Sequence, residues 1–209
     1  MTRVILVRHG ETDWNATRRA QGHADVPLNH AGRAQALDAA RELSAFTVDA
    51  VYSSDLMRAL DTAKEIARLH GLEVVVEPRF REIDQGEWTG LTSAEIRARW
   101  PGLWGPERHR SRRPGGESPA EVRRRALAAL AGAVEAHPDG TVVVVSHGGT
   151  IRWLSAAALG LDDDGAARIR GLRNGAMVSL DAFFDSGELR LCNLVRFDGA
   201  TAEVDDPNV

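Results

Sequence analysis

The sequence predicts a three-layer α/β/α sandwich with a mostly parallel central sheet. Near-continuous runs of aliphatic and β-branched residues, such as 4–7 and 142–145, are typical of strands that are buried on both faces. Segments with the apolar spacing of amphipathic helices follow most of these runs, and strand–helix alternation favours a parallel sheet with helices on both sides. We expect residues 1–209 to form a single domain, because a chain of this length can bury one sizeable core.

The individual elements follow from hydrophobic periodicity. Strands are expected, in chain order, at residues 3–7, 49–53, 73–76, 141–145, 176–181 and 188–197. The turn-like sequence Asp185-Ser186-Gly187 joins the last two strands as a hairpin. Helices are expected at residues 30–43, 55–70, 92–99, 118–136 and 150–159, and capping boxes begin at Thr92 and Ser118. The stretch 100–117 has no clear periodicity, and we expect it to form a lid or substrate loop.

Composition narrows the functional classes. The net charge of −4 lacks the basic surplus that nucleic-acid binding requires, so no nucleic-acid partner is expected. A single cysteine, Cys192, excludes an internal disulfide and fits a reducing compartment. Neither a signal peptide nor a membrane-spanning apolar run is present in the sequence. We therefore expect a cytoplasmic protein, monomeric or homodimeric, with no membrane partner and a small molecule as its substrate.

Two histidines stand where expected strands end. Arg8 and His9 follow the first strand, and His147 follows the strand 141–145, with glycine next in both places. Parallel strands deliver reactive side chains at their carboxyl ends, so the two histidines are expected to meet in one crevice. An arginine beside a histidine combines a fork for phosphate oxygens with a potential nucleophile. A third His-Gly pair, His70-Gly71, follows an amphipathic stretch and is interpreted as an ordinary helix C-terminus.

Several motifs in fixed order extend this pattern along the chain. They are Arg8-His9-Gly10-Glu11-Thr12 with Trp14-Asn15, Gln21-Gly22 with Pro27-Leu28, Ser53-Ser54-Asp55-Leu56 with Arg58-Ala59 and Thr62-Ala63, Arg81-Glu82 with Gly86, Trp88 and Gly90, Gly115-Gly116-Glu117-Ser118, and Ser146-His147-Gly148-Gly149. Over most of its length the chain therefore resembles the histidine phosphatase superfamily, the phosphoglycerate-mutase-like enzymes. The resemblance implies phosphoryl transfer without a metal ion or another cofactor.

The resemblance also implies roles for individual residues. His9 is the expected nucleophile, and a backbone carbonyl on its second ring nitrogen would fix its tautomer. Glu82 is the expected proton donor to the leaving oxygen and then the base for water. The phosphate would be held by Arg8, Asn15, Arg58, His147 and Gly148, and substrate-binding residues would be Gln21, Gly22, Arg112 and Arg113.

Arg58 has support of its own from its expected position in a helix. It falls in the first turn of a helix that Ser54 or Asp55 would start, where a cation is unfavourable unless an anion binds there. The alternative is an exposed arginine directed into solvent. Further along the chain, Arg123, Arg124 and Arg125 are interpreted as the solvated face of an amphipathic helix. Arg18, Arg19, His109 and Arg110 are further candidates for the pocket mouth, and Trp100 and Trp104 for packing against a sugar or base.

Alternatives to a phosphatase remain. A cofactor-dependent phosphoglycerate mutase of this superfamily has a tyrosine, a lysine and an asparagine where this chain has Gln85, Ser93 and Gly149. Those departures favour the phosphatase. A catalytically dead protein that binds phospho-ligands is a further alternative, although it would be expected to lack His9 or Glu82. A metal site is disfavoured, since no histidine pair has the i, i+4 spacing of zinc enzymes.

Overall fold

A computed structural model describes residues 1–103 and 109–197. Within them a six-stranded sheet has the order β3-β2-β4-β1-β5-β6. Its strands are β1 (Thr2–Arg8), β2 (Ala50–Ser53), β3 (Val74–Val76), β4 (Thr141–Ser146), β5 (Met177–Asp185) and β6 (Glu188–Arg196). The neighbours from β3 to β1 pair in parallel, whereas β5 runs antiparallel to both β1 and β6. The expected mostly parallel sheet is therefore confirmed.

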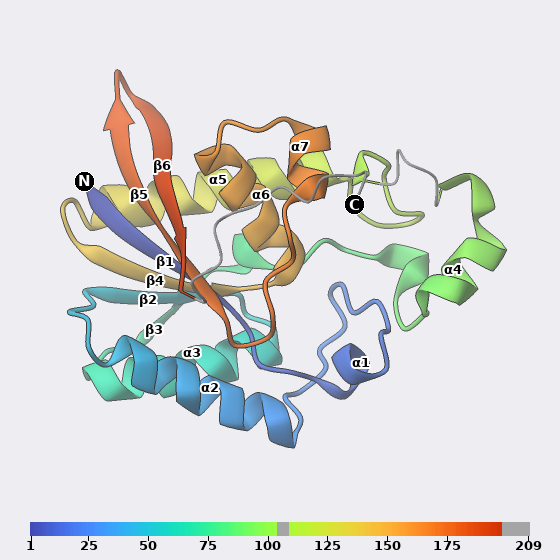
Figure 1. Cartoon of the computed structure of the whole chain (residues 1–209), viewed down its shortest axis with the longest axis horizontal. Coiled ribbons are helices and arrows are strands. Elements are labelled where there is room, and N and C mark those ends of the chain that lie inside the picture. The colour runs from blue at the N-terminus through green and yellow to red at the C-terminus, as the bar shows by residue number, and fades with distance from the viewer. Residues whose placement is uncertain (104–108, 198–209) are drawn as a thin grey trace.

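Helices cover both faces of this sheet, as Figure 1 shows. One layer holds α2 (His30–Leu43) and α3 (Met57–His70), and the other holds α5 (Pro119–Ala136) and α6 (Gly148–Ala158). Alternate residues of the central strands face opposite layers, because side chains of a strand alternate. Val4 and Leu6 pack against α5 and α6, while Ile5 and Val7 pack against α2 and α3. Burial on both faces explains why these strands are apolar throughout.

The expected boundaries differ from the structure at a few places. The hairpin strand β5 extends to Asp185, and Ser186 and Gly187 both have positive φ, as the twist of a two-residue hairpin turn requires. Among the described residues, the short 3-10 helices Pro78–Phe80, Gly86–Trp88 and Pro101–Leu103 and the short helices α1 (Asp13–Ala16) and α7 (Asp163–Arg168) were not predicted. Their lengths are too small for hydrophobic periodicity to reveal them.

Helix starts follow the expected capping chemistry with one correction. Thr92 and Ser118 form capping boxes at α4 (Ser93–Arg99) and α5, with Pro119 at the first helical position of α5. The expected caps of α3, Ser54 and Asp55, were wrong. Leu56 is the N-cap residue and makes no side-chain hydrogen bond, and Asp25 Oδ1 instead accepts from Met57 N at 2.7 Å. Arg58 nevertheless lies in the first turn, as expected.

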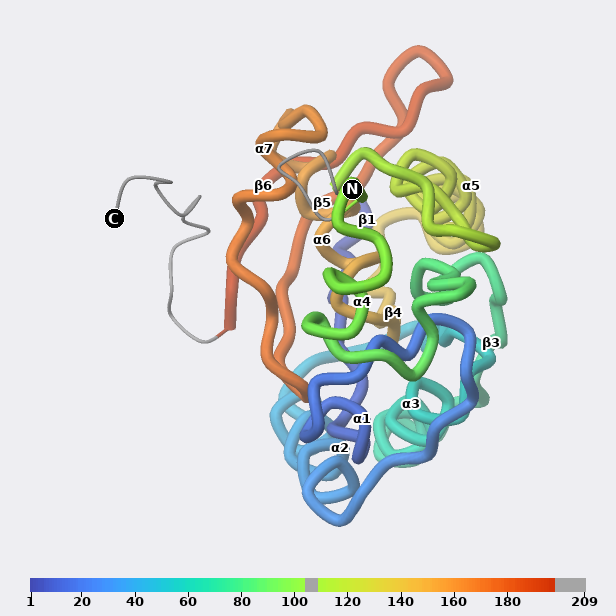
Figure 2. The backbone as a smooth tube through the Cα atoms, turned by 90° about the vertical axis from the view of Figure 1, so that its right-hand side faces the viewer, coloured from blue at the N-terminus to red at the C-terminus, as the bar shows by residue number. Residues whose placement is uncertain are grey.

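The sheet brings the two His-Gly segments together. Arg8 at the end of β1 is paired with Ser146 at the end of β4, so the residues that follow each strand emerge side by side. Figure 2 looks toward this edge, with α4 and α1 on the viewer's side. Residues 100–103 and 109–117 of the expected lid continue from α4, whereas 104–108, with Trp104, lie outside the described residues.

Candidate active site

His9 and His147 meet at the carboxyl ends of β1 and β4. Both are buried, with 3% and 0% of their surfaces exposed, and their ring centroids lie 5.1 Å apart. Gly10, which follows His9, packs against the backbone of α2, and a Cβ there would stand 2.2 Å from Gly32 O. Any larger residue would displace the turn that carries His9. The sequence Arg-His-Gly therefore sets the position of His9 as well as its chemistry.

Hydrogen bonding fixes the tautomer of His9. Its Nδ1 lies 2.6 Å from Gly10 O, and because a carbonyl only accepts, Nδ1 carries the proton. The lone pair of the neutral ring is then on Nε2. Burial, followed by the charges of Arg58 and Arg8, lowers the pKa of His9 well below its usual 6.5. His9 is therefore neutral, and its basic nitrogen is available as a nucleophile near neutral pH.

Arg58 is buried inside the protein and does not point into solvent. Only 1% of it is exposed, and its Nη1 and Nη2 donate to Ala24 O and Gly22 O, each at 2.8 Å. Burial lowers its pKa to about 10, while the charges of Glu82 and Asp25 oppose that change. A guanidinium with this pKa remains a cation at neutral pH. The backbone of residues 22–24 thus fixes the orientation of the Arg58 side chain.

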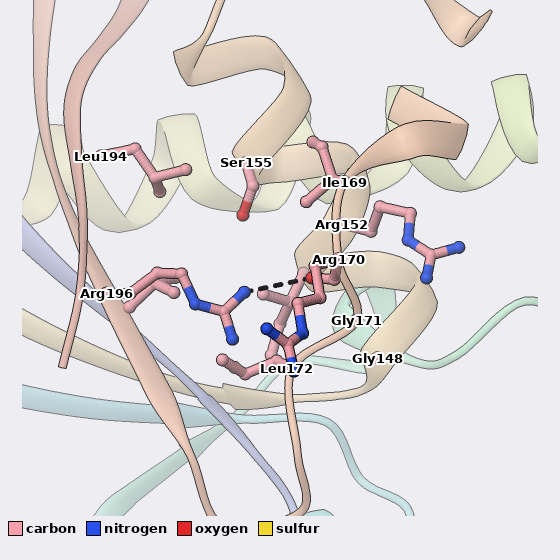
Figure 3. Close-up of a pocket in the computed structure, with 11 residues that line it drawn as sticks. Gly148, Arg152, Ser155, Ile169, Arg170, Gly171, Leu172, Leu194 and Arg196 are labelled. Atoms are coloured by element: carbon pink, nitrogen blue, oxygen red, sulfur yellow. Dashed lines mark hydrogen bonds between the residues drawn. The ribbon is translucent and has the colours of Figure 1, made fainter. Parts of the chain in front are cut away.

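Arg8 is held from behind by the segment that leads from α7 to β5. Its Nη1 donates to Leu172 O at 2.6 Å. Arg196 on β6 fixes the same segment by donating to Arg170 O at 3.1 Å, which Figure 3 shows with the residues around it. The cavity in this view has a volume of about 20 Å³, which is room for one water molecule. A cavity of this size is too small for a substrate. The residues around it therefore form the wall behind Arg8 and not a ligand pocket.

Glu82 lies in the segment between β3 and α4, next to the start of α6. Its Oε1 accepts from Ile83 N and its Oε2 from Gly149 N, both at 3.0 Å. The charge of Glu82 raises the pKa values of both Arg8 and Arg58 against the effect of burial, so the carboxylate is close to both guanidiniums. A Cβ on Gly149 would stand 2.3 Å from Glu82 Oε1. Glycine at 149 is thus what lets Glu82 occupy this place.

Asn15 has its amide oriented by its neighbours. Its Oδ1 accepts from Thr12 N and Thr12 Oγ1, and from Asn174 Nδ2 at 3.3 Å. The oxygen is thus occupied, whereas the Nδ2 group has no partner among the described residues and could donate to a phosphate oxygen. Asn174 also donates to His9 O at 3.0 Å, so one side chain orients both residues. Sequence reasoning missed Asn174, which lies outside every motif that it used.

His147 is also held neutral. Burial, then the charge of Arg58, lowers its pKa well below 6.5, and its Nε2 lies 2.9 Å from Ser54 Oγ. Within the described residues, the buried atoms His147 Nδ1, Arg8 Nε and Arg58 Nε have no hydrogen-bond partner. The Nε–H groups of Arg8 and Arg58 are donors, and donors without acceptors cost free energy. An oxyanion among these side chains would supply the missing acceptors. The buried Arg58, the partly buried Arg8 and these donors are the charge pattern expected of an anion site.

The interpretation of residues 123–125 as a solvated face is wrong for Arg125, whereas Arg124 is exposed as expected. The Arg125 side chain is only 18% exposed, and it pairs with Glu117 at 2.9 Å. The same guanidinium donates to the backbone carbonyls of Arg79, Arg81 and Glu82. Arg125 therefore holds the segment that carries Glu82. A signal was available, because Arg125 lies on the same side of α5 as the buried Val122 and Ala129, at spacings of three and four residues.

The four expected substrate-binding residues differ in their surroundings. Gln21 is 8% exposed and its Oε1 has no partner among the described residues, while Gly22 holds Arg58. Arg112 donates to Gly116 O and pairs with Glu121, and the Arg113 guanidinium lies 4.8 Å from the centre of the Trp88 ring. Both arginines thus make contacts within the base of the loop. Their contact with substrate stays a prediction.

The chain belongs to the histidine phosphatase superfamily (branch 1), whose family model matches residues 4–195. Phosphoserine phosphatase 1 of Hydrogenobacter thermophilus is 42% identical over 165 residues, which cover 78% of each chain. Glucosyl-3-phosphoglycerate phosphatase of Mycobacterium tuberculosis is 37% identical over 88% of this chain and 87% of its own. A probable phosphoglycerate mutase of Yersinia enterocolitica is 38% identical over 99% of this chain and 97% of its own.

Solved structures agree in fold. The structure of a mycobacterial glucosyl-3-phosphoglycerate phosphatase in complex with VO3 superposes with a TM-score of 0.84 at 38% identity and covers 92% of this chain and 96% of that one.

None of the helices in the described residues has both the length and the apolar character to cross a membrane.

Proposed function

We propose that the protein is a metal-independent phosphomonoesterase that works through a phosphohistidine on His9. The observation that carries the proposal is the neutral His9. Its Nε2 has no partner among the described residues, and the charges of the buried Arg58 and the partly buried Arg8 act on its ring. Phosphoryl transfer requires neutralisation of the phosphate oxygens, an in-line nucleophile and a proton for the leaving oxygen. The side chains gathered here meet each requirement.

In the first step His9 Nε2 attacks phosphorus, and the bond from phosphorus to the ester oxygen breaks. Arg8, Arg58 and Asn15 bind the phosphate oxygens, and His147 donates from its ring N–H. Glu82 gives its proton to the departing alkoxide, which leaves as the alcohol. In the second step Glu82, now a carboxylate, takes a proton from water. The resulting hydroxide attacks phosphorus, the P–N bond breaks, and inorganic phosphate is released with His9 neutral again.

The proposed substrate is a small, acidic or sugar-like phosphoester. Support comes from two relatives, which are named as phosphatases of phosphoserine and of glucosyl-3-phosphoglycerate. Each of these two compounds carries a phosphate ester and a carboxylate. Gln21 offers an unpaired buried oxygen to a substrate hydroxyl or amine. We place Arg112 and Arg113, with the loop 100–117, at the mouth of the pocket in a single domain. A cytoplasmic location and a monomeric or homodimeric state complete the proposal.

A mutase is the second candidate, and it has the support of the relative named as a probable phosphoglycerate mutase. The contact between Gly149 and Glu82 argues for the phosphatase. The mutase asparagine at this position would bring a Cβ to within 2.3 Å of Glu82 Oε1. In a mutase of this superfamily the carboxylate would therefore need another position than the one it has here.

A partition assay tests the proposal. The protein is incubated with phosphomonoesters after exhaustive chelation, and released phosphate is measured beside phosphoryl groups that appear on another position of the substrate. We expect phosphate release to dominate and to survive the chelator. Dominant isomerisation would favour the mutase, rescue by one divalent ion would overturn metal independence, and no turnover with any ester would favour a phospho-ligand binding protein.

A further inference from the structure

A second groove lies beside the active site, outside the residues assigned to chemistry above. Its volume is about 780 Å³, and it is lined by Arg8, Glu11, Arg18, Gln35, Gly171, Leu172, Arg173, Asn174 and Ala176. These residues come from the end of β1, the segment between β1 and α1, the turn after α1, helix α2 and the segment between α7 and β5. Figures 1 and 2 both show that this last segment descends to the region of α1 and α2.

The groove is positively charged in a protein whose net charge is −4. Three arginines line it, against one carboxylate, Glu11. That carboxylate already accepts from Asn29 Nδ2 at 2.9 Å. Arg18 and Arg173 are exposed, and neither side chain has a hydrogen-bond or ion-pair partner within residues 1–103 and 109–197. The exposed Arg41, by contrast, pairs with Asp38.

Neutral groups in the groove also favour an anion. Gln35 Oε1 accepts from Glu11 N, which leaves the Nε2 donor of the same amide without a partner among the described residues. Asn174, on the wall, donates to His9 O and to Asn15 Oδ1. Arg8 lines the groove and also belongs to the phosphate site. An anion bound in the groove would therefore contact Arg8 directly. Through Asn174 it would also affect the positions of His9 and Asn15.

We propose that this groove is a second anion-binding site for a small carboxylate or phosphate group, with Arg18 and Arg173 as its principal ligands. If the bound anion is a carboxylate of the substrate itself, the inference rests on the proposed function. The same chemistry would bind a separate anion, such as released phosphate. In either case the site would select for acidic ligands next to the phosphoryl-transfer centre.

A substrate comparison tests the first source of the anion. Propyl phosphate and a series of ω-carboxyalkyl phosphates of increasing length are assayed with the wild type and with the double variant Arg18→Ala/Arg173→Ala. The matched control is Arg41→Ala/Arg68→Ala, which removes the same charge from exposed helix positions. We expect the double variant to raise KM for one or more carboxylate esters about fivefold, and to leave propyl phosphate and the control unchanged.

Sulfate tests the second source. If sulfate binds both the phosphate site and a separate groove site, inhibition of propyl phosphate hydrolysis depends on more than the first power of sulfate concentration. A plot of reciprocal rate against sulfate concentration is then curved, and this curvature should disappear only in the groove variant. Amide NMR shifts of residues 171–176 during the sulfate titration report binding without turnover. They therefore remain informative even if no ester is hydrolysed. The proposal is overturned if the carboxylate preference, the curvature and the shifts are all the same in the groove variant as in the wild type.

Discussion

At the residue scale, burial decides what each ionisable side chain can do. His9 and His147 lose their charge because they are buried beside cations, whereas Arg8 and Arg58 keep theirs because the intrinsic pKa of arginine is so high. The site therefore holds two neutral rings, two cations and one carboxylate. A dianionic phosphate would balance the two guanidinium charges when Glu82 carries the proton that the proposed mechanism assigns to it. The same side chains would then bind phosphate and keep the His9 ring neutral.

The first prediction concerns the charge of His9 in the free protein. Because its pKa is lowered, His9 should remain neutral, with the proton on Nδ1, as pH falls through 6.5. The unfolded chain gains protons near pH 6.5 while the native site does not, so stability should fall as pH decreases below that value. The loss is at most about 1.4 kcal/mol per pH unit for each buried histidine.

Nitrogen-15 NMR of the imidazole rings measures this directly. His9→Gln identifies the signal by its disappearance, and a histidine-containing model peptide, with a pKa of about 6.5, gives the reference titration. A His9 ring that becomes a cation at or above pH 6.5 would contradict the prediction, as would a neutral ring protonated on Nε2.

The second prediction concerns Glu82 as the proton donor. Glu82→Gln should slow the phosphorylation of His9 by alkyl phosphates by about 10²–10⁴-fold, because an alkoxide needs a proton in order to leave. An activated aryl phosphate leaves as an anion and should lose far less. Since water still needs a base, phosphohistidine should accumulate with the aryl ester. Rapid-quench kinetics resolves the two steps, and equal losses for both esters without accumulation would assign the proton to another residue.

At the element scale, the segment 79–84 is clamped between two helices. The start of α6 supplies the Gly149 amide to the Glu82 carboxylate, and Arg125 of α5 binds the backbone around it. Thr150 Oγ1 also donates to Arg81 O at 2.8 Å. The helices on either side therefore fix a carboxylate that lies on an irregular segment. This would hold it in place for the proposed proton transfer.

The third prediction tests the α6 side of this clamp. Gly149→Ala should force the Glu82 carboxylate to rotate away, because the new Cβ would stand 2.3 Å from its Oε1. We expect the loss in kcat to be larger for alkyl than for aryl esters, as for Glu82→Gln. Gly132→Ala in α5 is the control, since nothing lies within 4 Å of a Cβ there. Unchanged alkyl ester kinetics in Gly149→Ala would show that this contact does not set the position of the acid.

The fourth prediction tests the α5 side. Arg125→Met removes the donors to three backbone carbonyls, and each unsatisfied acceptor costs about 1–3 kcal/mol if it stays buried. We expect kcat for alkyl esters to fall by about 10- to 100-fold with a smaller change in KM. Arg124→Met, an exposed neighbour on the same helix, should behave as wild type. A loss of stability with an unchanged leaving-group dependence would limit Arg125 to a structural role.

At the scale of the whole molecule, parallel pairing of β1 and β4 joins two segments that are far apart in sequence. The strands, the helices with capping boxes and the meeting of His9 with His147 were all predictable, because each depends on a local pattern followed by one rule of sheet topology. Asn174 and Arg125 were not predicted. Their roles depend on contacts with residues 159 and 43 positions away, respectively, which no local pattern encodes.

The burial of Arg58 shows the same limit. Its position in the first turn of a helix was predictable, but the carbonyls of Gly22 and Ala24 that hold it come from an irregular segment. Loop conformations of this kind depend on the complete fold. The helices of four and six residues, α1 and α7, escaped prediction because so few residues show no usable period.

The most direct test of the central claim is the covalent intermediate. Labelled substrate and enzyme are mixed, quenched in alkali within milliseconds, and the phosphorylated residue is located by mass spectrometry. The expected result is an acid-labile, base-stable phosphoryl group on His9 that forms and decays at rates compatible with turnover and is absent from His9→Ala. A burst of product without an adduct, or an adduct on His147 alone, would contradict the assignment of His9 as the nucleophile.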